Sequence, residues 1–180
     1  MSKSKAERIR YFKELMGGGF SSVQCECLAD QLDEMGFFNA PASAGHHGAY
    51  EGGLFDHSAE VTEQLLYLTR HLELKWGREK SPYIVGMFHD LCKVDQYRQK
   101  EDGGFEYRKD LILPGRGDKS VIIAQTLQEL TIEETLCIRW HMGAYEGKEI
   151  WNALGEAIRT YPNILYTHTA DMLASHVEGI

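Results

Sequence analysis

Apolar residues recur at helical spacing along nearly the whole chain, which predicts a protein built almost entirely from α-helices. The first such segment covers residues 6–16 and ends at three successive glycines. Ser21 and Ser22 are suited to cap a second helix that runs to Met35, and Gly36 is suited to stop it. We therefore expect two helices before residue 40.

Helical periodicity continues beyond a loop that is rich in glycine and proline, residues 37–53. Further helices are predicted over residues 54–74, 82–90, 118–130, 131–141, 149–160 and 162–177. A small β-hairpin near residues 105–113 is predicted from residues 106–108 and 111–113. The expected fold is all-α, a helical bundle in a single domain over residues 1–180, in which residues 1–40 cap a core formed by residues 41–180.

His89 and Asp90 end an apolar run, residues 83–88, and Lys93 follows three residues later. A histidine and an aspartate at the end of a buried segment are costly unless something satisfies them. A divalent metal would satisfy both, because imidazole and carboxylate groups are its ordinary nitrogen and oxygen ligands. The pair therefore predicts one part of a metal site.

Two further residues with metal-binding side chains, His57 and Asp171, lie upstream and downstream of the pair, each in an apolar helical context. Glycines 52 and 53 precede His57, and we expect them to let the chain pass close to the metal site. The order His, His-Asp, Asp resembles that of the HD-domain metal-dependent phosphohydrolases, over roughly residue 41 to the end of the chain. Taken alone, His57 would be an ordinary buried histidine.

The resemblance implies that His57, His89, Asp90 and Asp171 bind a divalent transition metal: manganese, iron, cobalt, nickel or zinc. Some HD families hold a second metal with additional histidines, and His141 is in the correct order for that role. Arg116 stands where a companion histidine is expected, and it cannot ligate a cation because it stays protonated. One ion is therefore expected rather than two, with His141 contacting substrate or metal.

The resemblance also implies hydrolysis of a phosphomonoester or phosphodiester, in a small phosphorylated substrate such as a nucleotide. Asp90, Lys93 and Arg116 are the expected catalytic residues. Lys93 matches the lysine of the family's HD-x-x-K pattern, although a helix-end lysine is also favoured by the helix dipole. Arg116, Lys93 and Lys119 are candidate phosphate-binding cations. Asp90 or Glu60 is the candidate general acid or base.

Three histidines are candidate substrate contacts. His141 and His168 follow the predicted metal-binding pair, and His168 shares a helical face with Asp171. His47 precedes the glycine pair. The alternative is a supporting or surface histidine at position 168 and a surface-loop histidine at position 47.

The amino-acid composition limits the classes of partner that we expect for this chain. The chain has 180 residues, with 19 basic and 27 acidic residues and a formal charge of −8, which argues against a nucleic-acid surface. Its four cysteines form no C-x-x-C pair, and neither a secretion signal nor a membrane-spanning run is expected. We expect a cytoplasmic protein with no membrane partner, whose first helices cap the bundle or form a homodimer contact.

Three other functions remain open at this stage. The same helical fold hosts di-iron oxygenases, which need two irons and more histidines, so Arg116 weakens that assignment. A ribonuclease acting on polymer is disfavoured by the net charge. A degenerate HD domain would bind a nucleotide or a partner protein without catalysis, which the presence of all four predicted ligands argues against.

Overall fold

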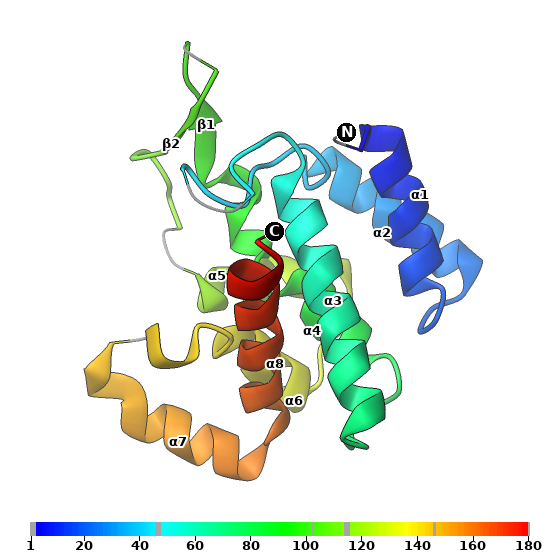
Figure 1. Ribbon diagram of the computed structural model, residues 1–180, viewed down its shortest axis with the longest axis vertical. Coiled ribbons are helices and arrows are strands. Elements are labelled where there is room, and N and C mark those ends of the chain that lie inside the picture. Colours follow the sequence, from blue (N-terminus) through cyan, green and yellow to red (C-terminus); the bar gives the residue numbers. More distant parts are fainter. Residues whose placement is uncertain (1–2, 46–47, 102, 114–115, 146, 180) are drawn as a thin grey trace.

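Helices dominate the computed structural model, which describes residues 3–45, 48–101, 103–113, 116–145 and 147–179. This confirms the predicted all-α class, and Figure 1 shows the arrangement of the elements. The α-helices are α1 (Lys5–Met16), α2 (Ser22–Glu34), α3 (Gly53–His71), α4 (Ser81–Phe88), α5 (Gly117–Leu127), α6 (Ile132–Arg139), α7 (Trp151–Thr160) and α8 (Asn163–Met172).

The helix starts follow the capping signals of the sequence. Ser4 and Ser21 cap α1 and α2, and each side chain accepts a hydrogen bond from the backbone N–H three residues later, reciprocated by a side chain at that position. Thr131 and Glu134 form the same capping box at α6. These local motifs explain why the predicted and observed starts of these helices agree closely.

The centre of the bundle is α3, which packs against α4 on one side and α8 on another (Figure 1). The α1–α2 pair lies beside α3 at one edge. Residues 37–53 form turns without regular structure, as predicted, yet they bury Phe37 and Phe38 completely. These two rings make edge-to-face contacts with Phe12 of α1 and Phe55 of α3, which ties the first two helices to the core.

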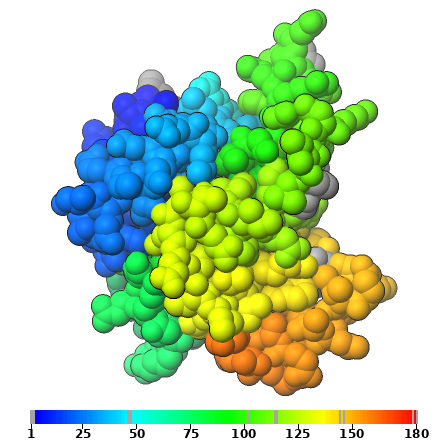
Figure 2. All heavy atoms as spheres, turned by 180° about the vertical axis from the view of Figure 1, so that it is seen from behind, coloured from blue at the N-terminus to red at the C-terminus, as the bar shows by residue number. Residues whose placement is uncertain are grey.

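A two-stranded antiparallel hairpin stands clear of the helices, in Figure 1 and from the opposite side in Figure 2. It joins β1 (Tyr97–Gln99) to β2 (Phe105–Tyr107), with Tyr97 opposite Tyr107. The predicted pairing of residues 106–108 with 111–113 is therefore wrong, because the strand that pairs with β2 precedes it in the chain. The turn between the two strands contains Gly103 and Gly104, and Gly103 has φ +84°, which favours glycine.

The last helix changes its geometry near its end. The predicted segment 162–177 is α-helical as α8 and continues as a π-helical turn, Leu173–Glu178. Within the described ranges, none of the helices combines the length and apolar character needed to cross a membrane.

Candidate metal centre

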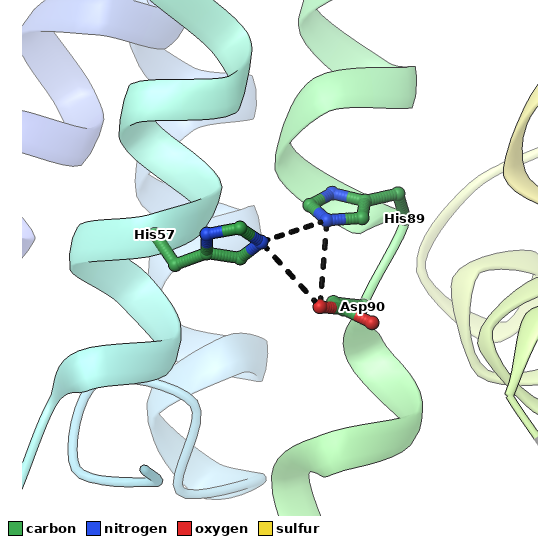
Figure 3. A group of neighbouring side chains, drawn as sticks. All are labelled: His57, His89 and Asp90. Atoms are coloured by element: carbon green, nitrogen blue, oxygen red, sulfur yellow. Dashed lines mark hydrogen bonds and ion pairs between the residues drawn. The ribbon is translucent and has the colours of Figure 1, made fainter. Parts of the chain in front are cut away.

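Two histidines and an aspartate meet in the interior of the bundle (Figure 3). His57 lies in the second turn of α3, and His89 and Asp90 directly follow α4. The two Nε2 atoms are 3.3 Å apart, and Asp90 Oδ2 lies 3.6 Å from His57 Nε2 and 3.4 Å from His89 Nε2. All three side chains are buried. Their donor atoms are of the kinds that hold a transition metal.

The end of α4 sets the direction of the Asp90 side chain. The helix was predicted to continue through residue 90, but it ends at Phe88, and His89 is its C-cap. Asp90 has φ −110° and begins a 3₁₀ turn, Leu91–Asp95. On a continuous helix, side chains at adjacent positions diverge by about 100°. The break lets neighbouring residues present His89 Nε2 and Asp90 Oδ2 to the same point.

The ring of His89 is fixed by a main-chain hydrogen bond. Its Nδ1 lies 2.8 Å from the carbonyl oxygen of Gly86 and donates to it. In its neutral form, which metal binding requires, the ring would present the lone pair of Nε2 toward His57 and Asp90. A backbone carbonyl on the outer nitrogen is the usual way in which a metal-binding histidine is oriented.

Asp171 approaches the same point from α8. Its Oδ1 lies 3.2 Å from His57 Nε2 and 4.0 Å from His89 Nε2. Ligand atoms that share one ion at about 2.1 Å lie about 3.0 to 3.5 Å from one another. The spacing of His57, His89 and Asp90 is close to that requirement, and Asp171 is within that range of His57. These four side chains are hereafter the His–Asp cluster.

Neighbouring charges keep the carboxylates of the His–Asp cluster ionised. Burial alone would raise the pKa of Asp90, but the Lys93 ammonium, 2.6 Å from Oδ2, and His89 hold it well below its ordinary value. Burial also opposes ionisation of Asp171, and the hydrogen bond from His57 lowers the pKa of that carboxyl. The pKa of His89 is raised, because the Asp90 and Asp171 carboxylates outweigh burial. Ionised carboxylates are the form that a cation needs.

His141 lies on the other side of Asp90. Its Nδ1 donates to the carbonyl of Ile138 at 2.7 Å, and its Nε2 lies 3.4 Å from Asp90 Oδ1. This Nε2 is buried and makes no hydrogen bond among the described residues. In the neutral ring it carries a lone pair that faces a carboxylate, so a cation or a proton is needed between them.

His168 contacts the main chain of His141. Its Nδ1 donates to the carbonyl oxygen of His141 at 2.8 Å, and its ring packs so closely on Gly143 that a Cβ there would lie 2.6 Å from it. Gly143 also has φ +52°, so both its backbone conformation and the contact with His168 favour glycine at this position. The structure thus places His168 against the main chain of His141.

A cavity of about 640 Å³ opens over the cluster. Asp90, Asp171 and Lys93 line it, together with Arg116, whose exposed guanidinium touches the sulfur of Met142 at 3.7 Å. Two carboxylates and two cations therefore share the lining of this cavity. Cationic side chains beside a site that could hold a metal suit a phosphate, because they offset its charge.

Several predicted residues lie elsewhere. Lys119 is buried with its ammonium against Asp95, and it does not line this cavity. Glu60 accepts a hydrogen bond from Gln64 at 2.8 Å and is likewise absent from the described lining. His47 lies outside the described residues. Burial raises the pKa of the Cys92 thiol to about 12, which keeps it a thiol rather than a nucleophile or ligand.

The glycines before His57 serve a different contact from the one expected. A Cβ on Gly52, whose φ is +84°, would lie 2.1 Å from Arg8 Cζ, and one on Gly53 would meet the carbonyl oxygen of Gly48 at the same distance. The close approach is therefore to α1 and to the preceding loop. Arg8 in turn bonds Asp56, the neighbour of His57, at 3.3 Å, which fixes the start of α3.

Tyr97, Tyr107, Tyr145, Ser175 and His176 are among the lining residues that were not predicted from the sequence. A signal for the first two was present, since they lie at equal distances from the turn of the hairpin. Ser175 follows Asp171 by one helical turn and donates to its Oδ1 at 3.3 Å, a spacing that the sequence shows.

Comparison with known proteins gives one curated relative. The dihydroneopterin 2',3'-cyclic phosphate phosphodiesterase of Methanocaldococcus jannaschii is 41% identical over 71 residues, which cover 38% of this chain and 28% of the relative. The match thus spans less than a third of that protein's length. No protein-family model and no solved structure matches the chain. The chain has partial homology to a phosphodiesterase, a hydrolase, and it contains a buried group of residues that could hold a metal.

Proposed function

We propose that this chain is a metal-dependent phosphohydrolase of the HD type that cleaves a phosphodiester in a nucleotide-like substrate. The observation that carries the proposal is the convergence of His57, His89, Asp90 and Asp171 beneath a cavity with cationic side chains. The partial relative, a cyclic phosphate phosphodiesterase by name, supports a diester rather than a monoester. The motif order in the sequence points to the same class.

We assign separate roles to the metal-ligand candidates and to the cations of the cavity. His57, His89, Asp90 and Asp171 would hold the ion. The chemistry that a divalent cation supplies in such a site is neutralisation of phosphoryl charge and activation of water. Lys93 holds Asp90 ionised, and Arg116 offers a planar fork of N–H donors to the phosphate at the exposed rim. Asp90 and Asp171 are the carboxylates of the described lining, so proton transfer falls to one of them.

The buried Nε2 of His141 favours a second candidate arrangement, in which His141 and Asp90 would help to hold a second cation. A site for two cations would also suit the di-iron oxygenase considered above. A measurement of oxygen consumption by the iron-loaded protein distinguishes an oxygenase from a hydrolase, because a hydrolase consumes no oxygen.

The test is hydrolysis of adenosine 2',3'-cyclic phosphate and of nucleoside monophosphates after loading with each candidate metal. We expect the diester to be cleaved and His89→Ala to lose at least about a thousandfold in kcat/KM, equivalent to about 4 kcal/mol. The matched control is His71→Ala, an exposed histidine of α3 stacked on Tyr67, which should behave as wild type. Equal cleavage by wild type and His89→Ala would contradict the proposal, and nucleotide binding without cleavage would leave a binding module.

A further inference from the structure

The lining of the cavity is aromatic as well as charged. Three tyrosines line it: Tyr97 and Tyr107 of the hairpin and Tyr145 of the turn after α6. We call these residues the tyrosine wall. Tyr107 and Tyr145 keep 54% and 63% of their surface exposed, so their ring faces are available to a ligand.

The hairpin holds two of these rings in a defined arrangement. Tyr97 and Tyr107 are directly opposite across the strands, with ring centroids 4.9 Å apart and planes at 54°. The Tyr97 hydroxyl donates to the carbonyl of Ala42 at 3.5 Å, which attaches the hairpin to the loop beneath it. Tyr97 is thus half-buried and anchored, whereas Tyr107 lies outermost.

A purely structural role would also place tyrosines here. An isolated two-stranded hairpin is marginal in water, and an aromatic cross-strand pair contributes to its stability. That role does not require the rings to border a cavity that is also lined by Asp90, Lys93 and Arg116. Because both hairpin tyrosines border this cavity, ligand recognition accounts for a position that hairpin stability leaves unexplained.

These lining residues together indicate a chemical class of ligand. A cavity of about 640 Å³ falls within the range that holds small ligands of nucleotide size. The charged residues suit a phosphate ester bound through a cation, and ring faces suit a flat heteroaromatic group, which stacks on tyrosine regardless of its exact substituents. A phosphate ester without a ring would leave the tyrosine wall in contact with water.

We propose that the tyrosine wall selects substrates in which the phosphate ester is joined to a flat fused-ring heterocycle, with Tyr107 as a specificity-determining residue. The inference rests on the proposed phosphohydrolase function. A purine nucleotide and a pterin phosphate share the required chemistry, and both belong in the test.

The experiment compares three cyclic phosphates on the metal-loaded protein. Two carry a ring, adenosine 2',3'-cyclic phosphate and neopterin 2',3'-cyclic phosphate. The third is the ribose cyclic phosphate with a methoxy group in place of the base. Tyr107→Leu removes the ring, Tyr107→Phe keeps it, and Tyr67→Leu is the matched control at an exposed tyrosine of α3 outside the cavity.

We expect Tyr107→Leu to raise KM about tenfold for whichever ringed substrate the wild type prefers, with kcat nearly unchanged. The ringless substrate should show no such change, and Tyr107→Phe and Tyr67→Leu should match wild type. A hairpin that had merely lost stability would affect all three substrates alike. Equal KM values for ringed and ringless substrates in the wild type, or no response to Tyr107→Leu, would overturn the inference and leave the proposed function standing.

Calorimetric binding of adenosine and neopterin, which lack phosphate, to metal-free protein separates the two proposals further. If no phosphate ester is cleaved but one of these compounds binds and Tyr107→Leu weakens its binding, the tyrosine wall is a ring site and the hydrolase proposal fails. If nothing is cleaved and neither compound binds, both proposals fail.

Discussion

A buried polar cluster lies at each end of α4, and the two clusters differ in what completes them. At the start of the helix, Glu134 accepts hydrogen bonds on both oxygens. Its donors are Arg78 Nε and Nη2, the Ser81 hydroxyl and the backbone N–H of Thr131, at 2.5 to 2.9 Å. We call this group the Glu134 cluster. Each of its buried acceptors has donors from the protein itself.

The His–Asp cluster at the other end of α4 is rich in acceptors instead. The His89 ring donates its proton to a carbonyl and turns a lone pair inward, and His141 does the same toward Asp90. Lys93 is the cation that the described structure brings to Asp90. Burying acceptors against one another is unfavourable unless a positive charge joins them.

The difference separates a structural cluster from one built for a ligand. The Glu134 cluster fastens α4 to α6 and closes without an added group. The facing acceptors of the His–Asp cluster need a cation or a proton between them. Both clusters contain buried carboxylates, so the balance of donors and acceptors is the property that distinguishes them.

The largest effect on folding is expected from Glu134→Gln, which leaves Arg78 without its carboxylate partner. We expect the free energy of unfolding to fall by about 2 to 3 kcal/mol, measured by urea denaturation. Metal content should stay unchanged, because the substitution is at the far end of α4. The matched control is Glu129→Gln, which removes the same charge from an exposed position. Loss of metal in Glu134→Gln would mean that the two ends are not independent.

The same variant should alter the response to acid. Burial opposes ionisation of Glu134, but the hydrogen bond from Arg78 and those from Thr131 and Ser81 hold its pKa below the ordinary value. A lowered folded pKa contributes stability above the unfolded pKa, about 4.3, and that contribution is lost as the pH falls through the folded pKa. Wild type should therefore lose stability more steeply than Glu134→Gln below about pH 4. Parallel curves would contradict this role.

A smaller effect is expected from Lys93→Met in the His–Asp cluster. Removing the ammonium from Asp90 should reduce kcat/KM by about ten- to a hundredfold, as is usual when the partner of a metal-binding carboxylate is lost. The matched variant Lys119→Met removes a buried lysine that pairs with Asp95 outside the cavity. It should keep nearly full activity at temperatures where it stays folded. An equal loss of kcat/KM in both variants would contradict this assignment and would indicate that Lys119 contacts the substrate.

The sequence was sufficient for most of the helices and for the identity of the candidate metal ligands, because both depend on local pattern. Periodicity and capping residues place the helices, and a histidine or aspartate in an apolar segment signals a buried polar group. The break after Phe88 was not predictable in this way, since the apolar run continues smoothly into His89.

Features that depend on distant contacts escaped prediction. Thr131 and Glu134 have the sequence spacing of a capping box, but Arg78 and Ser81 reach Glu134 from more than fifty positions away. The hairpin was assigned the wrong partner strand because short strands carry too little pattern to fix their pairing. Tyr145 joins the cavity through the tertiary fold alone.

The most direct test of the central claim is the metal content of the untagged protein beside Asp90→Asn and Glu134→Gln, measured by elemental analysis after loading and dialysis. We expect about one transition-metal ion per chain in wild type and in Glu134→Gln, and none in Asp90→Asn, since the amide removes the charge but keeps the shape. Absence of metal from loaded wild type, or equal metal in Asp90→Asn, would contradict the account.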